Sequence, residues 1–177
     1  MSFEGEKHPG IQSPTANSAG FCLNHTMLRT KNPDTALAFY SRVFGMQLLR
    51  RLDFEEMQFT LYFLANLQGD EAVPEDKGER TVWTFKQRGL LELTHNWGTE
   101  QQEDFSYHDG NAEPQGFGHI CFNVPNLEAA EEWFDTNNVT FIKRSDQGKM
   151  KNVIFVKDAD GYWIEVVQAD RLAELGD

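Results

Sequence analysis

The stretch Gly116-Phe117-Gly118-His119-Ile120-Cys121-Phe122 decides the fold. A turn of small residues runs into a strand-like apolar segment, and a histidine stands at the junction. An earlier stretch, Phe21-Cys22-Leu23-Asn24-His25-Thr26-Met27-Leu28, has the same design. Each copy continues into a helix-like segment and further strands, and the last of these strands holds one glutamate between large apolar residues. The sequence therefore predicts a duplicated module.

Both copies predict the order strand, helix, strand, strand, strand, which is an α+β fold of two tandem β-α-β-β-β modules with curved mixed sheets. In the first copy the helix is expected at 35–44, where apolar residues recur at i, i+3 and i+4 before Gly45. Its strands are expected at 21–29, 46–53, 57–64 and 90–96, with an additional strand at 81–85 and a polar loop at 67–80. The second copy predicts a helix at 127–137 and strands at 119–124, 141–144, 152–157 and 162–168.

These elements predict a simple domain organisation. Its parts are a flexible N-terminal arm at 1–20, a first module at 21–97, a linker at 98–115, a second module at 116–168 and a C-terminal tail at 169–177.

Composition limits the function. The formal net charge of −12 argues against a nucleic-acid partner, whose phosphates would be repelled. No apolar run is long enough to cross a bilayer, and the N-terminus lacks the pattern of a secretory signal, so we expect a cytoplasmic protein with no membrane partner. The two cysteines, Cys22 and Cys121, are expected to be buried thiols and not a disulfide.

Two histidines and two glutamates occupy matched positions: His25 and Glu92 in the first copy, His119 and Glu165 in the second. Taken singly, each such residue is usually structural. If the first and last strands of a copy are neighbours, however, each copy presents one imidazole and one carboxylate on the same face. Two copies facing each other would then bring together two nitrogen and two oxygen ligands, which suit zinc, nickel or cobalt. The residues alone leave open whether those copies belong to one chain or to two.

Several segments carry a family resemblance that runs from about residue 21 to about residue 168. They are Asn24–Arg29, Phe39–Met46, Leu61–Leu64, Leu91–Glu100, Gly116–Ile120, Gly148–Lys151 and Asp158–Glu165. The sequence resembles glyoxalase I of the vicinal-oxygen-chelate superfamily. The run Glu92-Leu93-Thr94-His95-Asn96-Trp97-Gly98-Thr99-Glu100 is the most specific part of the match, whereas the Asp-Gly-Tyr turn before Glu165 is shared more widely.

The resemblance implies a homodimer with metal sites shared across its interface. His25 and Glu92 of one chain would meet His119 and Glu165 of the other around one divalent metal per site. The N-terminal arm and the longer loops resemble the zinc class of the family, so zinc is expected, with nickel or cobalt as alternatives.

The resemblance also implies a substrate, the hemithioacetal of glutathione and methylglyoxal, and its conversion to S-lactoylglutathione through an enediolate. Glu165 is then the general base, and Glu92 is a metal ligand and a partner on the opposite face of the substrate. The implied substrate-binding residues are Arg29, Asn96, Gln115, His119, Lys143, Lys149 and Met150. Gln115 stands where the family often has arginine, so a neutral contact replaces a charge-assisted one.

Two other functions fit the same fold. An extradiol-type dioxygenase would use two histidines and one carboxylate around iron, and four matched ligands argue against it. A non-catalytic binding protein would have no need of two glutamates and two histidines at matched positions.

Overall fold

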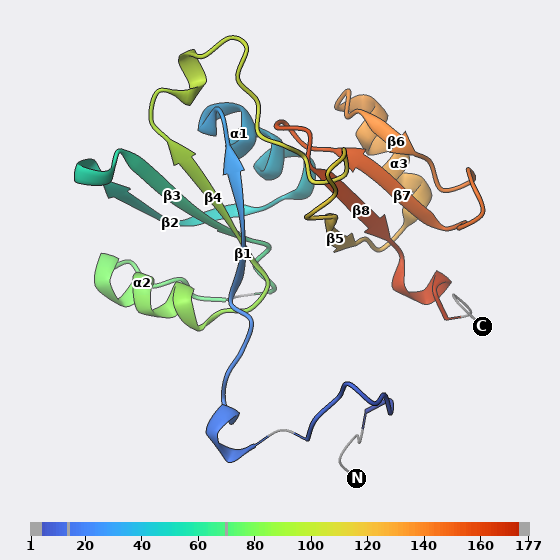
Figure 1. Ribbon diagram of the computed structural model, residues 1–177, viewed down its shortest axis with the longest axis horizontal. Coiled ribbons are helices and arrows are strands. Elements are labelled where there is room, and N and C mark those ends of the chain that lie inside the picture. Colours follow the sequence, from blue (N-terminus) through green and yellow to red (C-terminus); the bar gives the residue numbers. More distant parts are fainter. Residues whose placement is uncertain (1–4, 14, 70, 174–177) are drawn as a thin grey trace.

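Two four-stranded sheets lie side by side in the computed structural model, which describes residues 5–13, 15–69 and 71–173 (Figure 1). The first sheet has the order β1-β4-β3-β2 and the second has the order β5-β8-β7-β6. In each, the first and last strands of the module are parallel neighbours and the other pairs are antiparallel. The α+β fold with two tandem modules is therefore confirmed. The strands are β1 (His25–Thr30), β2 (Gln47–Phe54), β3 (Phe59–Ala65), β4 (Leu90–Asn96), β5 (His119–Asn123), β6 (Phe141–Lys143), β7 (Val153–Lys157) and β8 (Trp163–Val167).

In the described part of the chain, three α-helices accompany the sheets: α1 (Pro33–Phe44), α2 (Lys77–Lys86) and α3 (Leu127–Thr136). The side chain of Asn32 caps α1 by accepting a hydrogen bond from the Asp34 amide, and Gly45 ends it with φ 65°. Asn126 caps α3 in the same way through the Ala129 amide. Short 3₁₀ turns complete the structure: η1 (Ala16–Ser18), η2 (Glu55–Met57), η3 (Thr99–Gln101) and η4 (Ala169–Arg171).

The two modules share one hydrophobic core. It contains buried residues of both, among them Tyr40 of α1 and Phe134 of α3. The rings of Phe44 and Phe122 stack across the boundary at a centroid distance of 4.3 Å. The indole of Trp133 on α3 donates to the carbonyl of Val43 on α1 at 3.0 Å. These contacts fix how the modules of one chain sit relative to each other.

A buried polar contact adds to this attachment. The Tyr40 hydroxyl donates to Asp158 Oδ2 at 2.7 Å, which ties α1 to the turn between β7 and β8. The other carboxylate oxygen accepts from the amides of Asp160 and Tyr162, and Asp160 in turn accepts from the Lys31 amide. Burial raises the pKa of Asp158 to about 6, and burial also raises the pKa of Tyr40 well above its usual value.

The prediction of a strand at 81–85 is wrong, because α2 occupies these residues. The loop predicted at 67–80 is wrong for 77–80, which form the first turn of the same helix. Asp76 starts the helix by accepting from the amides of Gly78 and Glu79. Its inward side follows i, i+3, i+4 spacing, with Arg80, Trp83 and Thr84 less exposed than Val82 and Phe85. The β-branched and aromatic residues 81–85 favour a strand locally, but the cap and the packing of Trp83 against a small core under β2 and β3 override that preference.

The prediction that the first strand begins at residue 21 is also wrong, because β1 starts at His25. β1 lies at the edge of its sheet beside β4, which begins at Leu90 opposite His25, so within the described residues no strand lies beside the segment before His25. Phe21 and Leu23 lie 81% and 78% exposed on the segment that leads away from the sheets. The prediction that the two thiols are buried is also wrong. Cys22 and Cys121 form no disulfide, as expected, but both are exposed.

The segment between β4 and β5 is mostly irregular, and its end positions β5. Gly110 has φ 87° and packs so closely against the carbonyl of Phe117 that any side chain would collide with it. The Gly116 amide donates to the Gly110 carbonyl at 2.8 Å, and Asn111 donates to the Gly118 carbonyl at 2.6 Å. These contacts direct the chain into His119. The described residues include no helix that is long and apolar enough to span a membrane.

Candidate active site

The first module brings His25 and Glu92 together as predicted. In the parallel ladder of β1 and β4, Met27 pairs with Glu92, so residues 25, 27 and 29 share a face with residues 92, 94 and 96. His25 Nε2 lies 2.9 Å from Glu92 Oε2, and the Thr94 hydroxyl donates to Glu92 Oε1 at 3.0 Å. The side chain of Glu92 is 10% exposed. Among the described residues no lysine or arginine pairs with it, so a buried carboxylate faces a single imidazole.

The second module repeats the arrangement with a looser pair. His119 Nε2 lies 3.3 Å from Glu165 Oε2, and these side chains are 39% and 21% exposed. Cys121 pairs with Glu165 in the ladder of β5 and β8. Partial burial, followed by the hydrogen bond and negative charge of Glu165, raises the pKa of the Cys121 thiol to about 12. The thiol therefore stays protonated at neutral pH and is not a nucleophile.

An aromatic ring packs edge-on against each histidine, and sequence reasoning missed both rings. Phe63 on β3 pairs with Glu92, and its ring lies 5.5 Å from that of His25 at 80°. Phe155 on β7 pairs with Glu165, and its ring lies 5.3 Å from that of His119 at 74°. Both phenylalanines stand on the strand before the glutamate strand, so aligning the two copies position by position would have found them.

His25 has two further neighbours that sequence reasoning did not single out. Its Nδ1 lies 2.7 Å from Asn24 Oδ1. The ring of Phe85, on α2, lies 6.3 Å from the imidazole and 5.0 Å from Phe63. No sequence signal marks Phe85, because its position depends on a helix that the sequence did not predict.

The donor atoms fit a divalent cation. Metal bonds of about 2.1 Å to nitrogen and oxygen place two adjacent donors roughly 3 to 3.4 Å apart. The His25–Glu92 and His119–Glu165 separations, 2.9 and 3.3 Å, lie at or close to that range. Within residues 5–13, 15–69 and 71–173 of one chain, however, no three or more His, Cys, Asp and Glu side chains come together as a metal-binding group. One chain thus supplies two separate half-sites.

The predicted substrate-binding residues are divided between the two sheets. Arg29 and Asn96 lie on the face of the first sheet that carries His25, and Asn96 Nδ2 donates to the Tyr107 hydroxyl at 3.0 Å. Lys143, on β6, donates to the Val153 carbonyl at 2.5 Å, and burial lowers its pKa. The others are exposed: Gln115 in the segment before β5, and Lys149 and Met150 in the loop between β6 and β7.

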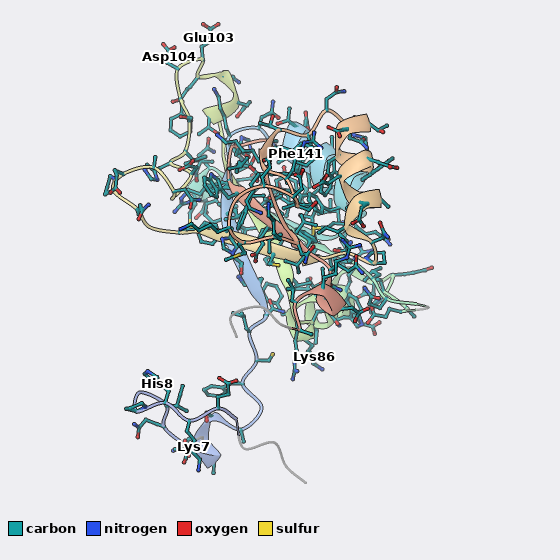
Figure 2. The ribbon with its side chains drawn as sticks, turned by 90° about the vertical axis from the view of Figure 1, so that its right-hand side faces the viewer. Lys7, His8, Lys86, Glu103, Asp104 and Phe141 are labelled. Carbon is teal, nitrogen blue, oxygen red and sulfur yellow. The ribbon has the colours of Figure 1, made fainter. Side chains whose placement is uncertain are left out.

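One cavity borders the second half-site without enclosing it. It has a volume of about 810 Å³ and runs along β5 between α1 and α3, touching His119 but not Glu165, His25 or Glu92. Figure 2 shows His8 on the N-terminal segment, away from both sheets. The candidate chemistry therefore resides on the open sheet faces and not in a closed pocket of one chain.

Comparison with known proteins gives a consistent result. The family pattern described as the Glyoxalase/Bleomycin resistance protein/Dioxygenase superfamily matches residues 22–166. A lactoylglutathione lyase of Pseudomonas aeruginosa is 56% identical over 177 residues, covering 99% of both chains, and one of Pseudomonas putida is 50% identical over 90% of this chain and 92% of its own. Glyoxalase I of Saccharomyces cerevisiae is 43% identical over 97% of this chain, which spans 52% of the yeast protein.

Solved structures agree on the fold. The trypanothione-dependent glyoxalase I of Leishmania major superposes with a TM-score of 0.62 at 26% identity, covering 88% of this chain and 91% of its own. Glyoxalase I of Zea mays superposes with a TM-score of 0.60 at 22% identity, covering 83% of this chain and 44% of its own.

Proposed function

The chain belongs to the glyoxalase/bleomycin resistance protein/dioxygenase superfamily, and from that membership we propose that it is a lactoylglutathione lyase whose metal site is shared between two copies of the chain. Its substrate is the hemithioacetal of glutathione and methylglyoxal, and its product is S-lactoylglutathione. Relatives named lactoylglutathione lyase that match nearly the whole chain at 50% to 56% identity support the reaction. The single observation that carries the proposal is the pair of matched half-sites, each with one imidazole against one carboxylate.

The separation of the half-sites supports a homodimer. A catalytic zinc site in proteins usually has three or more side-chain ligands, whereas each half-site offers two. The shared core and the Tyr40–Asp158 contact oppose a rearrangement that would bring both half-sites of one chain together. A second copy related by a twofold axis supplies the missing half-site twice over. His25 and Glu92 of each copy then face His119 and Glu165 of the other, which makes two equivalent sites.

We assign a divalent metal, zinc, to these four side chains, where its charge would stabilise the negative charge of an enediolate on two adjacent substrate oxygens. Glu165 is the base, because it is the more exposed and less closely held of the two carboxylates. It takes the proton from the carbon that bears sulfur and delivers it to the neighbouring carbon. The hydroxyl proton moves between the two oxygens, so the reaction balances without an oxidant.

The tighter carboxylate has a different role. Glu92 is held between His25 and the Thr94 hydroxyl, which keeps it in place as a ligand on the opposite face of the substrate. Arg29 and Asn96, further along the same face, bind the γ-glutamyl end of glutathione. Gln115, Lys143, Lys149 and Met150 lie toward the glycyl end, with His119 beside the reacting carbons.

The test is formation of S-lactoylglutathione from methylglyoxal and glutathione by zinc-loaded protein. Glu165→Gln keeps the shape of the side chain and removes the base, so we expect normal folding, near-normal zinc content and a loss of turnover of about 10²- to 10⁴-fold. Glu132→Gln, on the exposed side of α3, is the matched control and should retain wild-type turnover. Near-normal turnover by Glu165→Gln would overturn the assignment of the base. Uptake of dioxygen with a catechol, and no thioester, would point to dioxygenase chemistry instead.

A further inference from the structure

Asn24 is held in a single orientation by the backbone around it. Its amide nitrogen donates to the carbonyl of Thr84 at 3.1 Å and to the carbonyl of Gln87 at 2.8 Å. Carbonyl oxygens only accept, so the opposite orientation of the amide would place three acceptors against one another. The oxygen of Asn24 must therefore be the atom that faces His25.

This orientation determines which imidazole nitrogen carries hydrogen. Asn24 Oδ1 lies 2.7 Å from His25 Nδ1, and an amide oxygen can only accept, so Nδ1 is the N–H donor. In the neutral imidazole, the form that binds metals, the lone pair is then on Nε2, the nitrogen that faces Glu92 at 2.9 Å. A lone pair opposite a carboxylate requires a cation between them, which is the demand that a divalent metal meets.

From this geometry we propose that Asn24 is a positioning residue that fixes the tautomer and orientation of His25, so that Nε2 is presented as a metal ligand. The inference rests on the proposed metal site and goes beyond it by assigning the group that controls its first ligand. The rings of Phe63 and Phe85 both pack against the imidazole at steep interplanar angles and oppose its rotation. The two carbonyls that hold Asn24 belong to the end of α2 and to the residue after it. The position of α2 therefore determines the orientation of His25 through the side chain of Asn24.

The other half-site has no counterpart. Among the described residues, no hydrogen-bond partner faces His119 Nδ1. Its side chain is also more exposed than that of His25, 39% against 31%. A neighbouring amide therefore fixes the imidazole tautomer in the first half-site only, and changing Asn24 should leave His119 unaffected.

The test uses zinc-loaded full-length protein with ¹⁵N-labelled histidine. Two-bond ¹H–¹⁵N spectra should show hydrogen on Nδ1 of His25, exchanging slowly with water, and Nε2 without hydrogen. The His25→Gln variant assigns these signals by their loss. Asn24→Leu should make the Nδ1 hydrogen exchange faster and weaken zinc binding about 10- to 100-fold in competition with a chelator. Asn24→Asp keeps an acceptor for Nδ1 but cannot donate to the carbonyls of Thr84 and Gln87, so it should retain hydrogen on Nδ1 and bind zinc with an affinity between those of the wild type and Asn24→Leu.

Asn137→Leu is the matched control, because Asn137 also donates to a backbone carbonyl, that of Trp133, but lies at the C-terminal cap of α3, in the other module from His25. It should bind zinc as the wild type does. Hydrogen on Nε2 in the wild-type spectrum, or wild-type affinity in folded Asn24→Leu, would overturn the inference. If Asn24→Leu does not fold, the wild-type spectrum and Asn24→Asp still decide it. If the protein binds no zinc, the metal-free spectrum shows whether Nδ1 carries hydrogen, so the two proposals fail separately.

Discussion

The buried carboxyl of Asp158 makes stability depend on pH in a direction opposite to that of most carboxylates. Folding raises its pKa from 3.8 to about 6, mainly through burial, while Asp160 beside it raises the pKa further and the hydrogen bond from Tyr40 opposes the rise. A carboxyl whose pKa rises on folding stabilises the folded state fully below its unfolded pKa. That contribution is lost as the pH increases through the folded pKa.

The size of the effect follows from the two pKa values. At 1.36 kcal/mol for each pH unit, a change from 3.8 to about 6 corresponds to about 3 kcal/mol in total. About 2.5 kcal/mol of this should be lost between about pH 4 and pH 7.

Asp158→Asn isolates this contribution, because asparagine does not titrate. Its oxygen can accept from the Asp160 and Tyr162 amides, and its nitrogen can donate to the Tyr40 oxygen. We expect the free energy of unfolding of the wild type, minus that of the variant, to fall by about 2.5 kcal/mol from about pH 4 to pH 7. Urea titrations at a fixed protein concentration in the presence of a chelator measure this difference.

Asp53→Asn is the control of opposite sign. A hydrogen bond from Thr60, and then one from Arg51, lower the pKa of exposed Asp53, so its stabilising contribution is present at neutral pH and is lost as the pH falls. The corresponding difference for Asp53→Asn should therefore rise with pH. A difference for Asp158→Asn that stays flat or rises over the same interval would refute the reasoning from burial.

Three further predictions concern the metal, the substrate and a helix cap. A chelator should abolish S-lactoylglutathione formation and added zinc should restore it best; activation by nickel alone would contradict the zinc assignment. Gln115→Arg should lower KM for the hemithioacetal about five-fold, since a charge-assisted contact is worth roughly 1 kcal/mol more than a neutral one, whereas Gln102→Arg in the earlier loop should not. Asn126→Ala should lower the free energy of unfolding by about 1 kcal/mol in urea titration and Asn126→Ser by much less, because serine still caps α3; equal losses would contradict the cap.

The repeated pattern was sufficient to predict the architecture and the two half-sites. Alternation along β1 and β4 places residues 25 and 92 on one face, and the same spacing in the second copy places residues 119 and 165 together. Each of these pairs lies within one sheet, so the alternation of residues along the sequence is enough to predict it. The assumption behind this step was that the first and last strands of each module are neighbours, and the structure confirms it and shows that they are parallel.

The features that sequence missed depend on contacts between distant segments. The residues of α2 favour a strand locally, and only the Asp76 cap and the packing of Trp83 make them helical. Asn24 acquires its role from carbonyls about 60 residues further along the chain, which no spacing rule connects to it. Likewise, the loose hold on Glu165 relative to Glu92 depends on which neighbours cover each carboxylate.

The central claim is that each active site takes one half-site from each of two chains. The direct test mixes two inactive variants, His25→Ala and Glu165→Gln, with subunit exchange verified by separately tagged chains. In a mixed dimer one site receives both changes and the other receives none. Random mixing makes about half of the dimers mixed, so activity should return to about one quarter of the wild-type value. If the subunits exchange and no activity returns, the four ligands belong to a single chain and the account of a shared site is contradicted.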